Sequence, residues 1–226
     1  MTRFKISDAD HDRISKAVQQ AEAHSDGEII TVIAPRSDTY HDVGLHYAVA
    51  AMLLFLTCVA AFPNHFARFA SDIAGGWGHP LPPSLLLTML LGAQIAIFLI
   101  VRYALAWMPL RMALTPSATR HRRVQRQAVT IFRAIGEGRT RDRTAILLYL
   151  SVAEHRAEIV ADKGINRAVA PERWGEAMAA LIDPVREGRP AEGLVAAIGM
   201  IGAILAEYVP ATGDNPNELP DRLIEL

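Results

Sequence analysis

The sequence has little cysteine and lacks the short motifs that mark common metal and nucleotide sites. Its single cysteine, Cys58, excludes a disulfide framework and a CxxC metal site. The eight histidines are scattered, and none stands in an HExxH motif or another ligand spacing. Neither GxxxxGK[ST] nor GxGxxG occurs, so no loop of the kind that cradles nucleotide phosphates is present. We therefore expect no nucleotide partner.

Charged residues are absent from two long stretches. Residues 44–62 and 84–101 contain no Asp, Glu, Lys or Arg. A bilayer core of about 30 Å is crossed by roughly 20 helical residues. The second stretch extends to residue 106, because the stem of Arg102 can lie along apolar surface while its charge stays in water. Neither stretch has the polar stripe usual in buried helices of soluble proteins. The sequence therefore predicts a transmembrane hairpin with spans at about 44–62 and 84–106.

Basic residues are distributed unevenly around the hairpin. Residues 102–126 contain six arginines and no acid, whereas residues 63–83 contain only Arg68 and Asp72. The positive-inside rule then places the region after the second span in the cytoplasm, and a hairpin returns the N-terminal segment to that side. We assign the arginines to topology and lipid contact and expect no nucleic-acid partner. The prediction is a two-span inner-membrane protein with cytoplasmic termini and an irregular outward loop at 63–83.

The segments on either side of the hairpin alternate between helix and strand patterns. Ser7 and Asp10 resemble a capping box for a helix that ends near His24. The largely apolar runs 28–34 and 144–151 are typical of strands buried on both faces, and 156–162 is predicted to form an antiparallel hairpin with the second run. Helical spacing of apolar residues predicts further helices at about 117–135, 171–188 and 190–208.

This order of elements predicts an α/β fold with a small mixed β-sheet covered by helices on both faces, interrupted by the two-helix transmembrane hairpin. The expected organisation is a first part of the soluble domain, the hairpin, a second part of the domain and an extended tail. Their predicted ranges are 1–42, 43–110, 111–210 and 211–226.

Three acids lie where predicted strands begin or end, namely Asp26, Glu28 and Asp162. Carboxylate oxygens are ligands that Ca²⁺ and Mg²⁺ take, so these residues are candidates for holding a divalent cation. Each also has a structural interpretation, with Glu28 at the edge of the sheet and Asp162 as a turn acid. No nucleophile with an adjacent base is recognisable, so no catalytic residue is assigned.

The C-terminal tail combines helix-breaking and apolar residues. Pro216 and Pro220 oppose helix formation. Leu219, Leu223 and Ile224 offer apolar contacts at an otherwise polar end of the chain. They are candidates either for partner binding or for docking on their own domain, and the sequence leaves both alternatives open.

Three stretches of the chain resemble the TPM domain family. They are SDGEIITVIAP at 25–35, RTAILLYLSVAEHRAEIVADKGI at 143–165 and GLVAAIGMIGAILAEYVP at 193–210. The resemblance implies a bacterial membrane branch of the family in which a transmembrane hairpin is inserted into the domain.

Family membership implies more than one kind of function. Members have been connected with phosphatase activity or calcium, and others with auxiliary roles for membrane complexes. Members usually carry an Asp shortly after the strand hairpin, where this chain has Val169-Ala170-Pro171-Glu172. We therefore expect a binding or accessory module for an unidentified membrane protein partner. The alternative is a metal-dependent phosphatase with Ca²⁺ or Mg²⁺.

Overall fold

The chain folds into two compact units. The first comprises Met1–Asp38 and Ser117–Leu226 and is called the sheet unit; the second, Thr39–Pro116, is called the hairpin unit. The computed structural model describes residues 6–75, 81–137, 140, 144–212 and 218–226. The sheet unit is thus built from two segments that the hairpin unit separates in sequence.

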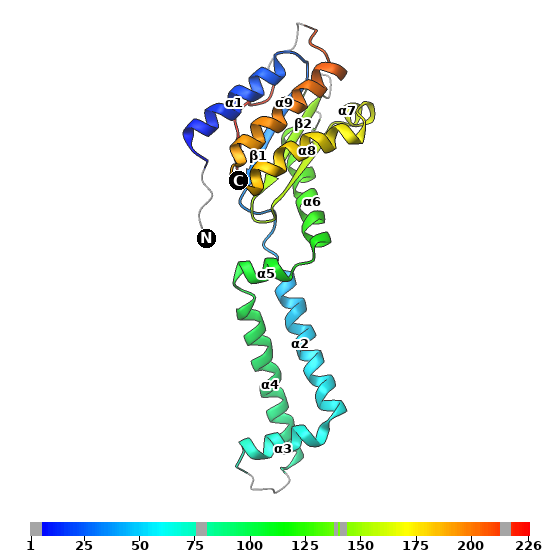
Figure 1. Ribbon diagram of the computed structural model, residues 1–226. Helices are drawn as coiled ribbons and strands as arrows, with labels where there is room; N and C mark the ends of the chain where they lie inside the picture. The colour runs from blue at the N-terminus through cyan, green and yellow to red at the C-terminus, as the bar shows by residue number, and fades with distance from the viewer. Residues whose placement is uncertain (1–5, 76–80, 138–139, 141–143, 213–217) are drawn as a thin grey trace. The chain divides into compact units, whose positions relative to one another are not determined.

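Four strands of the described residues form a mixed sheet in the sheet unit (Figure 1). In spatial order they are β3 (Arg156–Ala161), β2 (Ala145–Ser151), β1 (Glu28–Ala34) and β4 (Ile224–Glu225). β1 pairs in parallel with β2 and with β4, whereas β2 and β3 form an antiparallel hairpin. The predicted mixed sheet and strand hairpin are therefore confirmed.

The two central strands are adjacent although they are far apart in sequence. Their register pairs Glu28 with Ala145 and Ala34 with Ser151. Every residue of both strands is buried, as expected for apolar runs without polar alternation that are covered on two faces. β3 lies at one side of the sheet and is half-buried.

Helices cover both faces of this sheet (Figure 1). α1 (Asp8–Glu22), α8 (Pro171–Arg186) and α9 (Pro190–Tyr208) contribute to one core, and α6 (Ser117–Ile135) contributes to the other. Strand residues in the first core include Ile29, Ile33, Ile146 and Leu148. Those in the second core include Ile30, Val32, Leu147 and Tyr149. Alternate side chains thus enter opposite cores, and the predicted α/β fold is confirmed.

The ends of the helices follow local sequence signals in some places and not in others. The Ser7 hydroxyl accepts the backbone N–H of Asp10 at 3.1 Å, which confirms the predicted N-cap of α1. A short helix that the sequence did not predict, α7 (Lys163–Ala168), directly follows Asp162. Such a segment is too short for apolar periodicity to reveal it.

The hairpin unit contains the two charge-poor stretches as long helices. They form α2 (His41–Ala61) and α4 (Pro83–Ala104), which pack against each other. The side-chain amide of Gln94 in α4 donates to the backbone oxygen of Met52 in α2 at 3.2 Å. A polar residue in an apolar helix is thus used to join two helices.

The connection between the long helices is more regular than predicted. Instead of an irregular loop throughout 63–83, the chain forms α3 (Pro63–Ile73) immediately after α2. Pro63 stands in the first turn of α3, where its missing N–H costs no helical hydrogen bond. The prediction was wrong for this part, because the prolines and glycines that indicate a loop here lie at the ends of a helix and not within it. Residues 76–80 of the expected loop lie outside the described residues.

A buried arginine closes the other end of the hairpin unit. Arg111, in α5 (Met108–Leu114), donates to the backbone oxygens of Leu105 and Thr39 at 2.6 and 2.7 Å. The residue is only 4% exposed. It therefore joins the start of the unit to the chain that follows α4.

Candidate functional site

The three predicted acids lie at one edge of the sheet, which we call the amino edge. β1 and β2 are parallel and β3 runs the opposite way, so the beginnings of β1 and β2 meet the end of β3. Asp26 and Glu28 lie at the start of β1, and Asp162 follows the end of β3. All three residues are buried.

Each of these carboxylates accepts hydrogen bonds from its own domain. Asp26 accepts the backbone N–H of Thr212 at 3.1 Å and the hydroxyl of the same residue at 2.6 Å. Glu28 accepts the backbone N–H groups of Glu218 and Leu219, both at 3.3 Å. These contacts connect the start of β1 to the C-terminal segment.

The third acid joins two strands. A carboxylate oxygen of Asp162 accepts the backbone N–H of Ala145, the first residue of β2, at 3.2 Å. Within the part of the chain that the structure describes, no group of three or more His, Cys, Asp or Glu side chains is arranged to hold a metal ion. The amino edge therefore brings the predicted acids to one side of the sheet and uses them to fix backbone there.

An acid that the sequence analysis did not single out has the largest electrostatic shift at this edge. Glu22, in the last turn of α1, accepts the backbone N–H of Ile29 at 2.6 Å. Burial raises the pKa of Glu22 to about 8, against the effect of that hydrogen bond, and the nearby charges of Glu28 and Asp221 raise it further. Burial also raises the pKa of Glu28.

No local sequence signal marks Glu22, because its environment arises only when α1 packs near the start of β1. At this edge the pKa values of Glu22 and Glu28 are both raised, so these two carboxyls take up protons more readily than exposed carboxyls do.

A second polar cluster lies at the opposite, carboxyl ends of β1 and β2. It comprises Ser37, Tyr149, Ser151 and Glu154, and we call it the carboxyl-edge network. The Ser37 hydroxyl lies 2.9 Å from the Tyr149 hydroxyl and donates to Ser151 at 2.8 Å. The Glu154 carboxylate accepts the backbone N–H of Ser37 at 2.9 Å and the hydroxyl of Ser151.

This edge of an open α/β sheet is where ligands commonly bind, so the network is a candidate on fold grounds. Activation of a serine requires a base such as histidine beside it. The Ser37 hydroxyl bonds instead to the hydroxyls of Tyr149 and Ser151, and Glu154 accepts the backbone N–H of Ser37. Glu154 and Ser151 are also almost completely buried. The network is therefore suited to fixing the chain that leaves β1, and the sequence did not reveal it because it depends on the pairing of β1 with β2.

The predicted partner-binding residues of the tail pack on the sheet unit. Leu219 is 9% exposed and lies in the core beneath α6, whereas Leu223 is 5% exposed and lies in the core beneath α9. Ile224 is partly buried and belongs to β4, which pairs with β1. Of the two alternatives left open by the sequence, docking on the chain's own domain is the one observed. These side chains would reach a partner only if the tail left the sheet.

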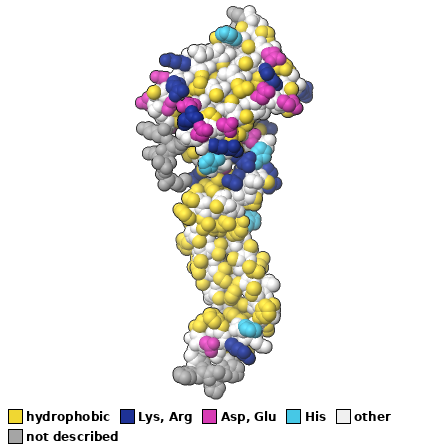
Figure 2. Space-filling view, in the orientation of Figure 1, with side chains coloured by type: hydrophobic (Ala, Val, Ile, Leu, Met, Phe, Trp, Pro, Cys, Tyr) yellow, Lys and Arg dark blue, Asp and Glu magenta, His cyan; other side chains and the backbone are white. Residues whose placement is uncertain are grey.

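The hairpin unit presents a different kind of surface. Three described helices are long and apolar enough to cross a membrane by length and composition: α2, α4 and α9. Half of the apolar window of α9 is buried inside the sheet unit, compared with 17% for α2 and none for α4. Hydrophobic side chains cover most of the visible face of α2 and α4 (Figure 2). Only α9 therefore has its apolar surface substantially covered by its own chain.

Comparisons with known proteins show a family likeness over part of the chain. A family model described as the TPM domain matches residues 108–204. A similar solved structure is the NMR structure of the BA42 protein from the psychrophilic bacterium Bizionia argentinensis, with a TM-score of 0.57 and 16% sequence identity. That likeness covers 100% of this chain and 99% of the BA42 chain, and at this identity it concerns the fold alone. No curated protein gave a significant match.

Proposed function

Because the chain carries a TPM domain, the family that its sequence resembles, we propose that it is a membrane-anchored member that acts as a binding module for other membrane proteins. In this proposal α2 and α4 cross the bilayer, and the sheet unit is held at the membrane surface. Nucleotides and nucleic acids are not expected among its ligands.

The observation that carries the anchoring is the uncovered apolar surface of α4. This helix has a mean hydropathy of 2.4 over its candidate span, and none of that window is buried by the rest of the chain. Its exposed side chains include Leu87, Leu91, Ile95 and Ile100. Exposing so much apolar surface to water costs free energy, and placing the helix in a bilayer removes that cost. Helix length also fits, since 22 residues exceed the roughly 20 needed to cross the core.

The binding role is supported by the use that the domain makes of its polar groups. Asp26, Glu28 and Asp162 hold neighbouring backbone, and the carboxyl-edge network holds the chain after β1. A catalytic carboxyl needs a positioned partner and access to substrate. A domain that binds another protein needs a stable surface and no such group.

Anchoring is tested by alkaline carbonate extraction of membranes that contain the full chain. The protein is expected in the pellet. A variant with Leu91→Lys and Ile95→Lys carries two charges on the exposed surface of α4, each disfavoured at the centre of a membrane helix by about 3 kcal/mol, and is expected to be extracted. Release of the unaltered chain into the supernatant would contradict the anchoring.

Binding is tested by cross-linking in isolated membranes before solubilisation. The same membrane protein chain should be recovered with this protein, in constant ratio, from independent preparations. Recovery of uncross-linked single chains at every cross-linker concentration would count against the proposal.

A metal-dependent phosphatase is the second candidate, and the shared position of three acids at the amino edge is the observation in its favour. The solubilised full chain is assayed with a generic phosphomonoester and Mg²⁺, Mn²⁺ or Ca²⁺, beside the triple variant Asp26→Asn, Glu28→Gln, Asp162→Asn. Metal-dependent turnover that the variant abolishes without unfolding would replace the binding proposal by the enzyme.

A further inference from the structure

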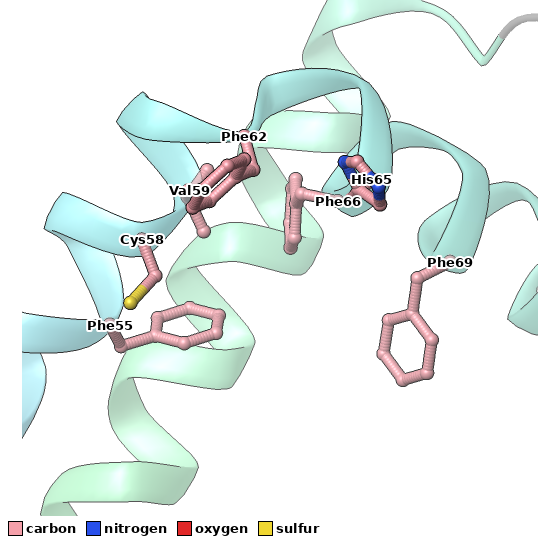
Figure 3. Close-up of a pocket in the computed structure, with 7 residues that line it drawn as sticks. All are labelled: Phe55, Cys58, Val59, Phe62, His65, Phe66 and Phe69. Carbon is pink, nitrogen blue, oxygen red and sulfur yellow. The ribbon is translucent and has the colours of Figure 1, made fainter.

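An open apolar notch lies where α2 meets α3 within the hairpin unit. Its volume is about 510 Å³, in the range of roughly 300–1,000 Å³ typical of small-molecule sites. Figure 3 shows the lining side chains, which come from the end of α2, the joint and α3. They are Phe55, Cys58, Val59, Phe62, His65, Phe66 and Phe69. The surface that they offer is almost entirely hydrocarbon and aromatic.

The notch is held open by the way the chain turns. α2 ends at Ala61, Phe62 adopts a non-helical conformation, and Pro63 begins α3. The rings of Phe55 and Phe66 meet edge to face with centroids 6.3 Å apart, so the two walls touch at one point. Phe62 and Phe69 are 61% and 63% exposed, so their rings border the notch without filling it.

α3 has the pattern of a helix that lies in a membrane interface. Phe62, Phe66, Phe69 and Ile73 recur at helical spacing and form one apolar side. Arg68 and other polar residues follow on the adjoining side and are exposed. A short helix with separate aromatic and polar sides places the first among acyl chains and the second among headgroups.

We infer that the notch binds one acyl chain of a phospholipid, with α3 lying in the headgroup region of the same leaflet. The inference rests on the proposed membrane anchoring and names a ligand that anchoring alone does not require. Two observations favour a lipid chain over other occupants. The notch is continuous with the apolar surface of α2, so a lipid beside the span reaches it without crossing water. Arg68 is exposed and directly precedes the lining residue Phe69, so its positive charge can meet a phosphate headgroup near the notch.

Cys58 supplies the test, since it is the chain's single cysteine and lines the notch. The rate of its alkylation by N-ethylmaleimide is measured on the delipidated full chain in detergent while phosphatidylglycerol is added. The expected result is protection of Cys58 that saturates at a few lipids per protein. A matched reporter is Leu54→Cys in a Cys58→Ser background, one turn earlier on α2, 66% exposed and outside the notch. Alkylation of this reporter cysteine should slow only when lipid makes up a large share of the micelle.

A variant with Phe66→Ala and Phe69→Ala removes two walls of the notch. It should raise the lipid concentration for half-maximal protection at least about tenfold, equivalent to about 1.4 kcal/mol. Native mass spectrometry should show a retained lipid on the parent chain and its loss from this variant. Inorganic phosphate should give no protection, because the contact is made by the acyl chain.

Three results would overturn the inference. The first is equal protection of cysteines at positions 54 and 58 from alkylation. The second is an unchanged lipid concentration for half-maximal protection in the Phe66→Ala, Phe69→Ala variant. The third is protection that increases with protein concentration, because a second copy of the chain then covers the notch. Carbonate extraction separates this failure from that of the proposed function. A chain that stays in the pellet but shows no selective protection is anchored without a lipid in the notch.

Discussion

The carboxylate of Glu22 lies 2.6 Å from the backbone nitrogen of Ile29, so the last turn of α1 is hydrogen-bonded to the first strand. The charge on this carboxylate is disfavoured by burial, and Glu28 and Asp221 lie close enough to disfavour it further. The contact between α1 and β1 therefore depends on a group that changes charge near neutral pH.

The first prediction concerns this pH dependence. The pKa of Glu22 is raised to about 8 in the folded chain, so folding takes up a proton between the unfolded value of 4.5 and about 8. The stabilising contribution is complete below pH 4.5 and is lost as pH rises to about 8. Glu22→Gln, which keeps an acceptor for Ile29, should flatten the fall in Tm between pH 5 and pH 9. The exposed control Glu176→Gln should leave the parent profile unchanged, and an unaltered slope in Glu22→Gln would refute the assignment.

The second prediction uses two glycines of α9 with opposite surroundings. A Cβ at Gly193 would lie 2.5 Å from the backbone oxygen of Leu181, whereas one at Gly199 would meet nothing within 4 Å. Gly193→Ala should therefore destabilise the chain by about 1–3 kcal/mol through overpacking. Gly199→Ala should stabilise it by about 0.5–1 kcal/mol through helix propensity. Urea unfolding followed by circular dichroism measures both, and shifts of the same sign would contradict the close packing of α8 and α9.

A third prediction addresses the C-terminal tail. Leu223 is buried in the core, so Leu223→Ala should lower the free energy of unfolding by about 2–5 kcal/mol. Leu226→Ala removes a side chain that is 57% exposed and should change it by less than about 0.5 kcal/mol. Equal stability of both variants would mean that the tail is undocked in solution and available to a partner.

The fourth prediction concerns the side of the membrane on which each part lies. Single cysteines replace exposed Asp72 in α3 and exposed Arg186 in α8, both in a Cys58→Ser background. With six arginines after the second span, a membrane-impermeant maleimide added to intact cells should label position 72 and spare position 186. Permeabilisation should then expose position 186. The reverse order of labelling would place the sheet unit outside the cytoplasm.

Much of the fold could be predicted because its signals are local. The runs at 28–34 and 144–151 are largely apolar, and the structure has strands at these positions. Ser7 similarly marks the start of α1. In contrast, β4 contains two residues and has no periodicity to detect, so its pairing with β1 could not be foreseen.

The contacts of the site residues are harder to predict from the sequence than the strands and helices are. Asp26, Glu28 and Asp162 were recognised as strand-end acids, and the topology does bring them to one edge. Their hydrogen bonds to the tail and to β2 were not predictable, because each links segments distant in sequence. Glu22 and the carboxyl-edge network are hidden for the same reason.

The parallel pairing of Glu28 with Ala145 also sets the order of events during synthesis. At about 5–20 residues per second, translation reaches β2 on the order of 10 s after β1 has been made. During that interval the hairpin unit is completed, while β1 has neither of its neighbours in the sheet. An apolar strand left uncovered for this time is a target for chaperones or for premature aggregation. In a nascent chain the whole hairpin unit is therefore complete before the sheet on either side of it in sequence can close.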